Sequence, residues 1–388
     1  MTKITDIPAI RFKGFSDTWE QRKLGDVVDV RSGKDYKHLS EGNIPVYGTG
    51  GFMLSVNQAL SYDEDAIGIG RKGTIDKPYI LKAPFWTVDT LFYAIPREKV
   101  DLNFAFDVFQ NIDWKKKDES TGVPSLSKTA INEIDVLVPQ YDEQQPLGQF
   151  FNRIDNLITL HQRKYDKLTN VKKSMLEKMF PQNGSNAPEI RFKGFTEAWE
   201  QRKVTEIGKI YIGLVTTMTK HYTDEGTLLI RNSDIKDGKF EFGDNPIYLE
   251  KTFAEKNETR MHQIGDVITV HTGDVGTSAV ITENEAKSIG FATIVTRPNP
   301  KIIDSNYLCS FLNTDKHKKW AVSISTGDGR TNYNFGDYFE LVVPVPSIAE
   351  QKKIASYIQK LNRLITLHQR ELEKLKNLKK ACLEKMFV

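Results

Sequence analysis

The sequence has few cysteines and no long apolar run. Its 388 residues include two cysteines, Cys309 and Cys382, which stand alone and form neither a disulfide framework nor a metal-binding motif. No apolar stretch approaches the ~18–20 residues that a membrane-spanning helix needs. The opening MTKITDIPAIRFKGF lacks the apolar core of a signal peptide. These absences predict a reduced, cytoplasmic protein with no membrane partner.

Motifs for catalysis are also missing. The sequence contains no Walker A string, no H-E-x-x-H motif, no Asn/Asp-Pro-Pro-aromatic motif of amino-methyltransferases and no recognisable D…E-x-K nuclease cluster. GTGGF (48–52) lacks the strand–turn–helix setting of a dinucleotide or methyl-donor site, which favours a tight turn. His161 and His368 have no second ligand one helical turn away. We therefore expect no catalytic residue, no metal and no cofactor bound by this chain.

The sequence does contain a large internal duplication. IRFKGFSDTWEQRKL (10–24) returns as IRFKGFTEAWEQRKV (190–204), and the block at 138–180 returns at 345–387. The polar, Pro- and Gly-bearing segment PQNGSNAP joins the two copies. Between the repeated blocks, the two middle regions differ in sequence and in length. The chain is therefore one unit that occurs twice, with a variable middle.

The variable middles predict mixed α/β (α+β) domains. Short β-type runs such as NIPVYGTGG and DVITVHTGDVGTSAVI are broken by turn dipeptides, and helical stretches are expected at 103–117 and 304–322. The predicted organisation is a first globular domain at 1–141, a long helix at 142–180, a linker at 181–188, a second globular domain at 189–348 and a second long helix at 349–388.

The two predicted helices carry a heptad repeat, which is typical of a coiled coil. Both contain the string LITLHQR, at 157–163 and at 364–370. A polar residue at a seam position, such as His161 or His368, fixes the register of pairing. The residues predicted to pair the helices are Ile154, Leu157, His161, Leu168, Leu361, Leu364, His368 and Leu375.

Three loops have the composition of a nucleic-acid contact: GRKGTIDK (70–77), HTGDVGTS (271–278) and STGDGRTNYNFGD (325–337), the last with a counterpart at 119–129. Arg, Lys, Asn, Ser and Thr hydrogen-bond to base edges or phosphates, and aromatic rings stack on bases. Solvated loops are the alternative interpretation. The candidate contacts are Arg71, Lys72, Thr74, Thr121, Ser125 and Lys128 in the first copy, and Arg231, Thr272, Arg330, Asn332, Tyr333 and Asn334 in the second.

The distribution of charge argues against a freestanding basic DNA-binding domain. Residues 25–137 carry 13 basic and 17 acidic side chains, and residues 205–344 carry 15 and 19, so each middle has a net charge of −4. A domain that binds DNA by itself is usually basic. If these middles contact DNA, they do so through local patches, with partner subunits neutralising many of the phosphates.

The repeated blocks resemble the specificity subunit of type I restriction–modification systems over nearly the whole chain. The FKGF/WEQRK openings, the paired LITLHQR helices, and LLIRNSDIKDG (228–238) carry the resemblance. So do the V-P-x₃-E-Q segments, with Pro139, Glu143 and Gln144 in the first copy and Pro346, Glu350 and Gln351 in the second. The resemblance implies two target recognition domains, each reading one half of a bipartite, asymmetric site in double-stranded DNA. It also implies antiparallel spacer helices and a pseudo-two-fold arrangement.

The resemblance further implies partner subunits that carry the chemistry. Two modification subunits would methylate adenine at N6 with S-adenosylmethionine, and restriction subunits would add ATP- and Mg²⁺-dependent translocation and cleavage. This chain would then recognise the DNA sequence for the complex and would not carry out the chemistry. A non-catalytic coiled-coil scaffold that displays two protein-binding domains remains the alternative. A self-sufficient methyltransferase or nuclease is disfavoured by the missing motifs.

Overall fold

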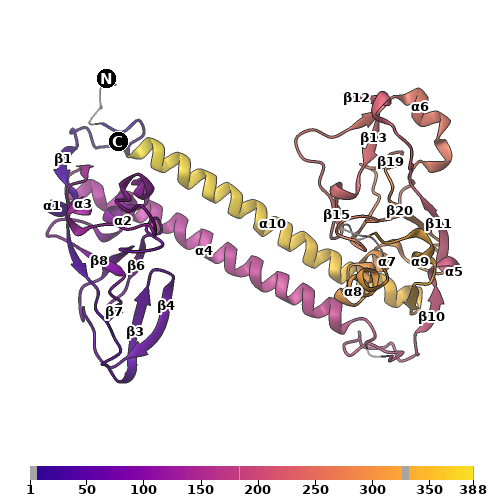
Figure 1. The fold of residues 1–388 in the computed structure, drawn as a ribbon, viewed down its shortest axis with the longest axis horizontal. Coiled ribbons are helices and arrows are strands. Elements are labelled where there is room, and N and C mark those ends of the chain that lie inside the picture. The colour runs from indigo at the N-terminus through magenta and orange to yellow at the C-terminus, as the bar shows by residue number, and fades with distance from the viewer. Residues whose placement is uncertain (1–6, 183, 326–331, 388) are drawn as a thin grey trace. The chain divides into compact units, whose positions relative to one another are not determined.

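The computed structural model describes residues 7–182, 184–325 and 332–387, and divides into two compact units. Unit 1 consists of Met1–Gln162 with Arg370–Val388, and unit 2 of Arg163–Gln369. Each unit combines a mixed α/β globule with parts of both long helices, α4 (Tyr141–Lys178) and α10 (Ile348–Met386) (Figure 1). Among the described residues, no helix is long and apolar enough to cross a membrane.

Unit 1 is built around a four-stranded antiparallel sheet. Its strand order is β2 (Val28–Ser32), β8 (Leu91–Pro96), β5 (Ala66–Gly70) and β6 (Tyr79–Leu81). A smaller sheet has the order β4 (Gly51–Val56), β3 (Glu41–Gly48) and β7 (Trp86–Thr87), and β1 (Glu20–Lys23) pairs with β9 (Asp135–Val138). The helices are α1 (Leu24–Val27), α2 (Leu102–Asn111) and α3 (Lys128–Asn132). Every residue of β5 is buried, as expected for a central strand covered on both faces.

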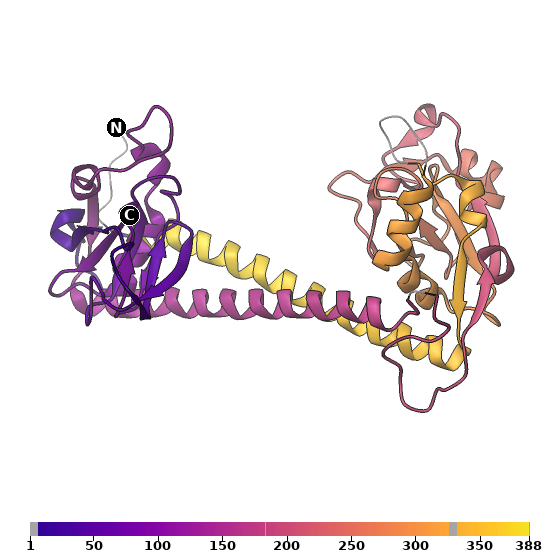
Figure 2. The same cartoon turned by 60° about the horizontal axis from the view of Figure 1, so that its bottom comes forward.

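Unit 2 repeats this frame. Its main sheet has the order β11 (Gly208–Ile212), β20 (Ile294–Pro298), β17 (Val267–Thr269) and β18 (Ser278–Val280), and β10 (Glu200–Lys203) pairs with β21 (Val342–Val345). A second sheet, absent from unit 1 in this form, contains β12 (Tyr222–Thr223), β16 (Tyr248–Leu249), β13 (Thr227–Ile230) and β19 (Ile289–Gly290). A short hairpin joins β14 (Ile235–Lys236) to β15 (Lys239–Phe240). The helices are α5 (Val204–Ile207), α6 (Lys251–Lys256), α7 (Ser305–Leu312), α8 (Asp315–Ile324) and α9 (Phe335–Phe339) (Figure 2).

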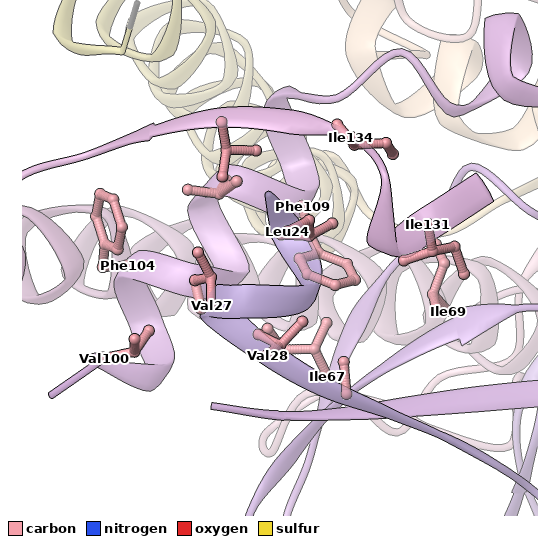
Figure 3. Packing of buried hydrophobic residues seen from close by; sticks show 14 of the residues in the cluster. Leu24, Val27, Val28, Ile67, Ile69, Val100, Phe104, Phe109, Ile131 and Ile134 are labelled. Carbon is pink, nitrogen blue, oxygen red and sulfur yellow. The ribbon is translucent and has the colours of Figure 1, made fainter. Parts of the chain in front are cut away.

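The core of unit 1 is the interface between helix α2 and the main sheet. Asp101 caps α2 by accepting a hydrogen bond from the backbone N–H of Phe104, and the helix buries Phe104 and Phe109. Figure 3 shows the Phe109 ring beside Val28 and Ile67 of the sheet, and the Phe104 ring on the side of Val27 and Val100. Burying a side chain of this size contributes roughly 1.5–3 kcal/mol. Helix α7 occupies the equivalent place in unit 2 and is capped by Asp304 in the same way.

Each core is completed by the end of a long helix. In unit 1, Phe387 after α10 stacks on Phe104 with ring centroids 5.7 Å apart and meets Trp19 edge-on. In unit 2, Phe180 after α4 packs against Trp199 and Tyr307. The repeated L-E-K-M-F endings therefore supply core residues in both copies.

The long helices pack along a seam whose members alternate three and four residues apart. In unit 2, Leu168 of α4 and Leu361 of α10 belong to one hydrophobic cluster, and in unit 1 Lys379 of α10 donates to Asp155 Oδ2 of α4 at 2.6 Å. The early part of α4 thus meets the late part of α10, so the helices run antiparallel within unit 1. Ile154 is buried, and His161, His368 and Leu375 are half-buried.

Leu157 and Leu364 are more exposed than the predicted pairing implies. Leu157 is 45% exposed and Leu364 is 42% exposed, so neither is a buried seam residue, and their part in pairing the helices stays a prediction. Their neighbours Ile158 and Ile365 are half-buried instead. The heptad pattern does not distinguish the leucine from the isoleucine that follows it as the buried residue, because both are apolar.

A buried ion pair fixes the first turn of each long helix to the opening block of its own copy. Arg11 donates to both oxygens of Glu143 in α4, and Arg191 donates to both oxygens of Glu350 in α10, from Nη2 at 2.7 and 2.8 Å. Glu143 is 2% exposed and Glu350 is fully buried. The glutamine that follows each glutamate is also fixed by a hydrogen bond. Gln351 donates to the Pro346 carbonyl in unit 2, and Gln144 donates to the Pro139 carbonyl in unit 1. These contacts give the V-P-x₃-E-Q segments a structural role.

Candidate nucleic-acid interface

A polar groove in unit 1 gathers most of the candidate contacts of the first copy. It encloses about 500 Å³ beside the end of β5. Arg71, Lys72, Ser125 and Lys128 line it, whereas Thr121 lies outside it. Thr74 is half-buried and is not part of the lining. The structure therefore brings the segments around Arg71 and Lys128 together in one groove, which the sequence did not predict.

The loop that follows β5 is held in place by its backbone. A Cβ on Gly70 would lie 1.9 Å from the Thr74 carbonyl oxygen, so the loop turns back at a position that only glycine can occupy. The N–H of Gly73 donates to the Pro124 carbonyl at 2.8 Å, and Lys72 forms a β-bridge with Ser125. The basic side chains are thus presented from a fixed loop.

The net charge of the groove lining differs in sign from the net charge of residues 25–137, which is −4. The lining contains three basic side chains and two acidic ones, Asp89 and Glu119. The Arg71 guanidinium lies over the Phe92 ring, 5.7 Å from the centroid, and its Nη1 donates to the Asp89 carbonyl at 3.5 Å. Asp118 accepts backbone hydrogen bonds from Ser125 and Ser120, and these lower the pKa of its carboxyl. The lining of the groove therefore has a net charge of +1 within an acidic domain.

The second copy places its candidate loop in the same position of the fold. After β17, Thr272 forms a β-bridge with Asn332, just as Lys72 does with Ser125 in unit 1. The Thr272 hydroxyl donates to Asn332 Oδ1 at 2.9 Å. Asn334 precedes α9 at the N-cap position, and its amide donates to Asp337 Oδ2 at 3.0 Å without capping a backbone N–H. The two candidate loops of each copy are thus bridged to each other in both units, which the sequence did not predict. Whether these side chains contact DNA stays a prediction.

Tyr333 does not fit its predicted role, and the prediction that it stacks on DNA is wrong. Its side chain is fully buried among Trp320, Tyr338 and His317, and burial raises the pKa of its hydroxyl well above the usual range. Burial also lowers the pKa of His317 to about 4, so this ring is neutral at physiological pH. The aromatic residue of the NYN string is thus a core residue. Arg330 lies outside the described residues.

Arg231 has a structural partner. Its guanidinium donates to both carboxylate oxygens of Asp234, which is buried, at 3.0 and 2.8 Å. This ion pair shapes the turn between β13 and β14. The prediction that Arg231 contacts DNA is untested, and the ion pair leaves fewer of its N–H groups for a base.

Two residues that support the second loop were not predicted. Asn232 accepts from the His271 N–H at 2.7 Å, and its amide donates to the carbonyls of Phe291 and Ala292. His271 is half-buried and contacts the Thr272 hydroxyl at 2.8 Å, and its burial lowers the pKa of the ring. Asn232 lies within LLIRNSDIKDG, so the signal was present in the sequence, but nothing there shows which loop the amide holds.

The GTGGF segment and the possible metal ligands can be compared with the expectations from the sequence. GTGGF forms the turn of the β3–β4 hairpin, where Gly48 pairs with Gly51 and Gly51 has φ +104°, so the prediction of a tight turn is confirmed. Within the described ranges, no three His, Cys, Asp or Glu side chains gather as a metal cluster would require. Two α/β domains that share one frame, present different side chains from equivalent loops and carry long helices define a duplicated recognition protein.

Comparisons with known proteins place this recognition protein in a family. The profile described as "Type I restriction modification DNA specificity domain" matches residues 16–170 and 196–377. The chain therefore belongs to the family of type I restriction–modification specificity subunits, which recognise DNA and are generally non-catalytic.

Relatives and solved structures agree with this assignment. The chain is 21% identical over 406 residues to the type I restriction enzyme MjaVIII specificity subunit of Methanocaldococcus jannaschii, covering 94% of this chain and 91% of that protein. It is 26% identical over 137 residues to the EcoBI specificity subunit of Escherichia coli, covering 35% and 29%. Its fold matches the type I restriction–modification S subunit from M. genitalium with a TM-score of 0.67 at 14% identity, over 98% of this chain and 99% of that one.

Proposed function

We propose that this chain reads a bipartite, asymmetric DNA site, one half-site in each unit, within a complex that contains two modification subunits. The observation that carries the proposal is the pair of equivalent loops. Lys72 bridges to Ser125 in unit 1, and Thr272 bridges to Asn332 in unit 2. The same frame therefore presents different side chains, as expected of two readers that recognise different sequences.

The chemistry of the complex is assigned to its partners. S-adenosylmethionine would bind the modification subunits, and ATP and Mg²⁺ would bind the restriction subunits that complete the assembly. The partners would also contribute much of the phosphate neutralisation, since each middle is net negative. This chain then supplies the DNA sequence recognition of the complex.

Substitution of Arg71 by alanine tests the reading of DNA. If Arg71 contacts a base, its loss should cost about 1–3 kcal/mol at one position and relax specificity there. Methylation-aware sequencing of host DNA should then show the first half-site degenerate at that position, with the second half-site unchanged.

Lys82→Ala is the matched control for Arg71→Ala. It removes the same charge from unit 1, at an exposed lysine that pairs with Asp65 outside the groove. It should leave the methylated sites unchanged. Degeneracy in both half-sites, or in neither, would refute the assignment of this groove. A complex with no sequence preference at all would favour a scaffold of protein-binding domains.

The repeated helices offer a surface for two copies of one partner. Leu157 and Leu160 of α4, and Leu364 and Leu367 of α10, are between 42% and 50% exposed. They come from the same LITLHQR string, and none of the four belongs to a hydrophobic core cluster of the described residues. We assign these leucine pairs to the docking of an apolar surface on each modification subunit.

Replacing one leucine pair by glutamate should remove one modification subunit. Each buried leucine contributes roughly 1.5–3 kcal/mol, so Leu157→Glu with Leu160→Glu should weaken one docking site strongly. Native mass spectrometry should then show one modification subunit per chain where the unaltered complex has two. Asn156→Glu is the control, because Asn156 is exposed on the same turn and the second copy has Arg363 in its place. Full occupancy in the leucine variant would exclude this surface.

A further inference from the structure

The β3–β4 hairpin of unit 1 ends in two exposed apolar side chains. The strands are joined by the two-residue turn Thr49–Gly50, and Phe52 and Met53 follow it (Figure 1). Phe52 is 63% exposed and Met53 is 50% exposed. Val46 pairs with Leu54 and Tyr47 pairs with Phe52, so Met53 is the extra residue of a β-bulge near the turn. The bulge leaves two adjacent apolar side chains exposed at the tip of the ribbon.

Apart from Glu41 at its base, the hairpin lacks charge, although it belongs to an acidic domain. Residues 42–62 contain no Asp, Glu, Lys, Arg or His. A ribbon without carboxylates can approach a phosphate backbone closely, because it meets no like-charge repulsion. The absence of lysine and arginine also means that this ribbon would contribute contact with bases rather than neutralisation of phosphates.

The hairpin is continuous with the basic groove. The Tyr47 carbonyl in β3 accepts from the Val88 N–H at 3.0 Å, and the two residues that follow Val88 line the groove. The Thr90 carbonyl in turn accepts from the Arg71 N–H at 2.8 Å. A short, hydrogen-bonded path thus joins the apolar tip to the candidate DNA-contacting loop.

We propose that the tip of this hairpin enters the major groove at the first half-site, where Phe52 and Met53 read thymine by contact with its C5-methyl group. The major groove is about 12 Å wide and admits a two-stranded β-ribbon, and phenylalanine is among the side chains that contact the thymine methyl. The proposal rests on the proposed function, because it takes unit 1 to be a reader of duplex DNA.

The test removes the methyl group from the DNA and the apolar side chains from the protein. Equilibrium binding is measured with the assembled complex of this chain and its modification partner, on duplexes carrying the methylated site. Each thymine of the first half-site is replaced in turn by deoxyuridine. Loss of one buried methyl group should weaken binding of the unaltered complex about fourfold at one position.

The variant Phe52→Ala with Met53→Ala should bind the thymine duplex about tenfold more weakly. It should also bind the thymine and deoxyuridine duplexes equally. Ile264→Ala is the matched control, because Ile264 is an exposed apolar residue of unit 2, and it should keep the fourfold difference. The deoxyuridine arm leaves the protein unchanged, so it tests the proposal even if the hairpin variant fails to fold.

Three results would overturn the proposal. One is an unaltered complex that tolerates deoxyuridine at every position. Another is a hairpin variant that still distinguishes thymine from deoxyuridine. The third is a hairpin variant that loses its modification partner while deoxyuridine has no effect, which would assign the tip to a protein contact. Failure of the proposed function is distinguishable, since the unaltered complex would then bind its methylated site no better than a scrambled duplex.

Discussion

Replacing Arg191 by alanine should lower the free energy of unfolding of unit 2 by about 3–5 kcal/mol, because it leaves a buried carboxylate without its partner. Glu350 has no exposed surface and accepts from two guanidinium nitrogens of Arg191. Amide hydrogen exchange measures the effect within one unit. Protection in β17 should fall by that amount, whereas protection in β5 of unit 1 should fall much less.

A double variant separates the electrostatic contribution of the ion pair to stability from the contribution of the packing volume of its side chains. Replacing a buried ion pair by apolar side chains of similar size is often neutral or stabilising. Arg191→Met with Glu350→Leu should therefore recover most of the protection that Arg191→Ala loses. Arg11 and Glu143 provide the same comparison in unit 1. A loss below about 1 kcal/mol in the single variant would contradict the role assigned to the pair.

The ion pairs change how the repeated sequence is understood. Arg191 holds Glu350, Trp199 is buried, and Gly194 has φ +98°, a conformation that favours glycine. Most of the identity between the opening blocks is thus explained by contacts inside each unit. The exposed leucines of LITLHQR have no such explanation, which is why they are the better candidates for a shared partner.

The sequence predicted the arrangement well where one pattern dominated. Heptad spacing predicted helices at 142–180 and 349–388, and the structure has α4 at Tyr141–Lys178 and α10 at Ile348–Met386. The predicted helix at 304–322 is two helices instead, because the Thr314 hydroxyl accepts from the His317 N–H and begins α8. Side-chain capping is a local choice that periodicity does not reveal.

Prediction was weaker where a residue had two plausible partners. Ser347 and Glu350 form the pattern of a capping box, and the Ser347 hydroxyl does accept from the Glu350 N–H. The Glu350 carboxylate, however, goes to Arg191, which is 159 positions away in sequence. Tyr333 was assigned to the surface by the polar residues around it, yet its ring fills the core. The position of such a side chain depends on partners that are distant in sequence, and these partners cannot be identified from local composition.

The two long helices should set the distance between the half-sites that the complex reads. A helix rises ~1.5 Å per residue, so four added residues lengthen it by about 6 Å. Duplex DNA rises ~3.4 Å per base pair, which predicts a gap wider by about 1–2 base pairs. The boundaries between the units fall at Gln162/Arg163 and at Gln369/Arg370. Insertions next to both boundaries lengthen the helices without separating residues that pack within one unit.

We would insert four helix-forming residues after Arg163 and four after Arg370, both at the end of LITLHQR. A four-residue insertion is a stutter in the heptad repeat, which coiled coils accommodate by local unwinding. Methylation at the original sites should be lost, and sites with the same half-sites and the wider gap should be methylated instead. Four residues inserted after Gly184, in the exposed linker, should leave the gap unchanged. An active complex that keeps its original gap after both helix insertions would show that the helices do not measure it.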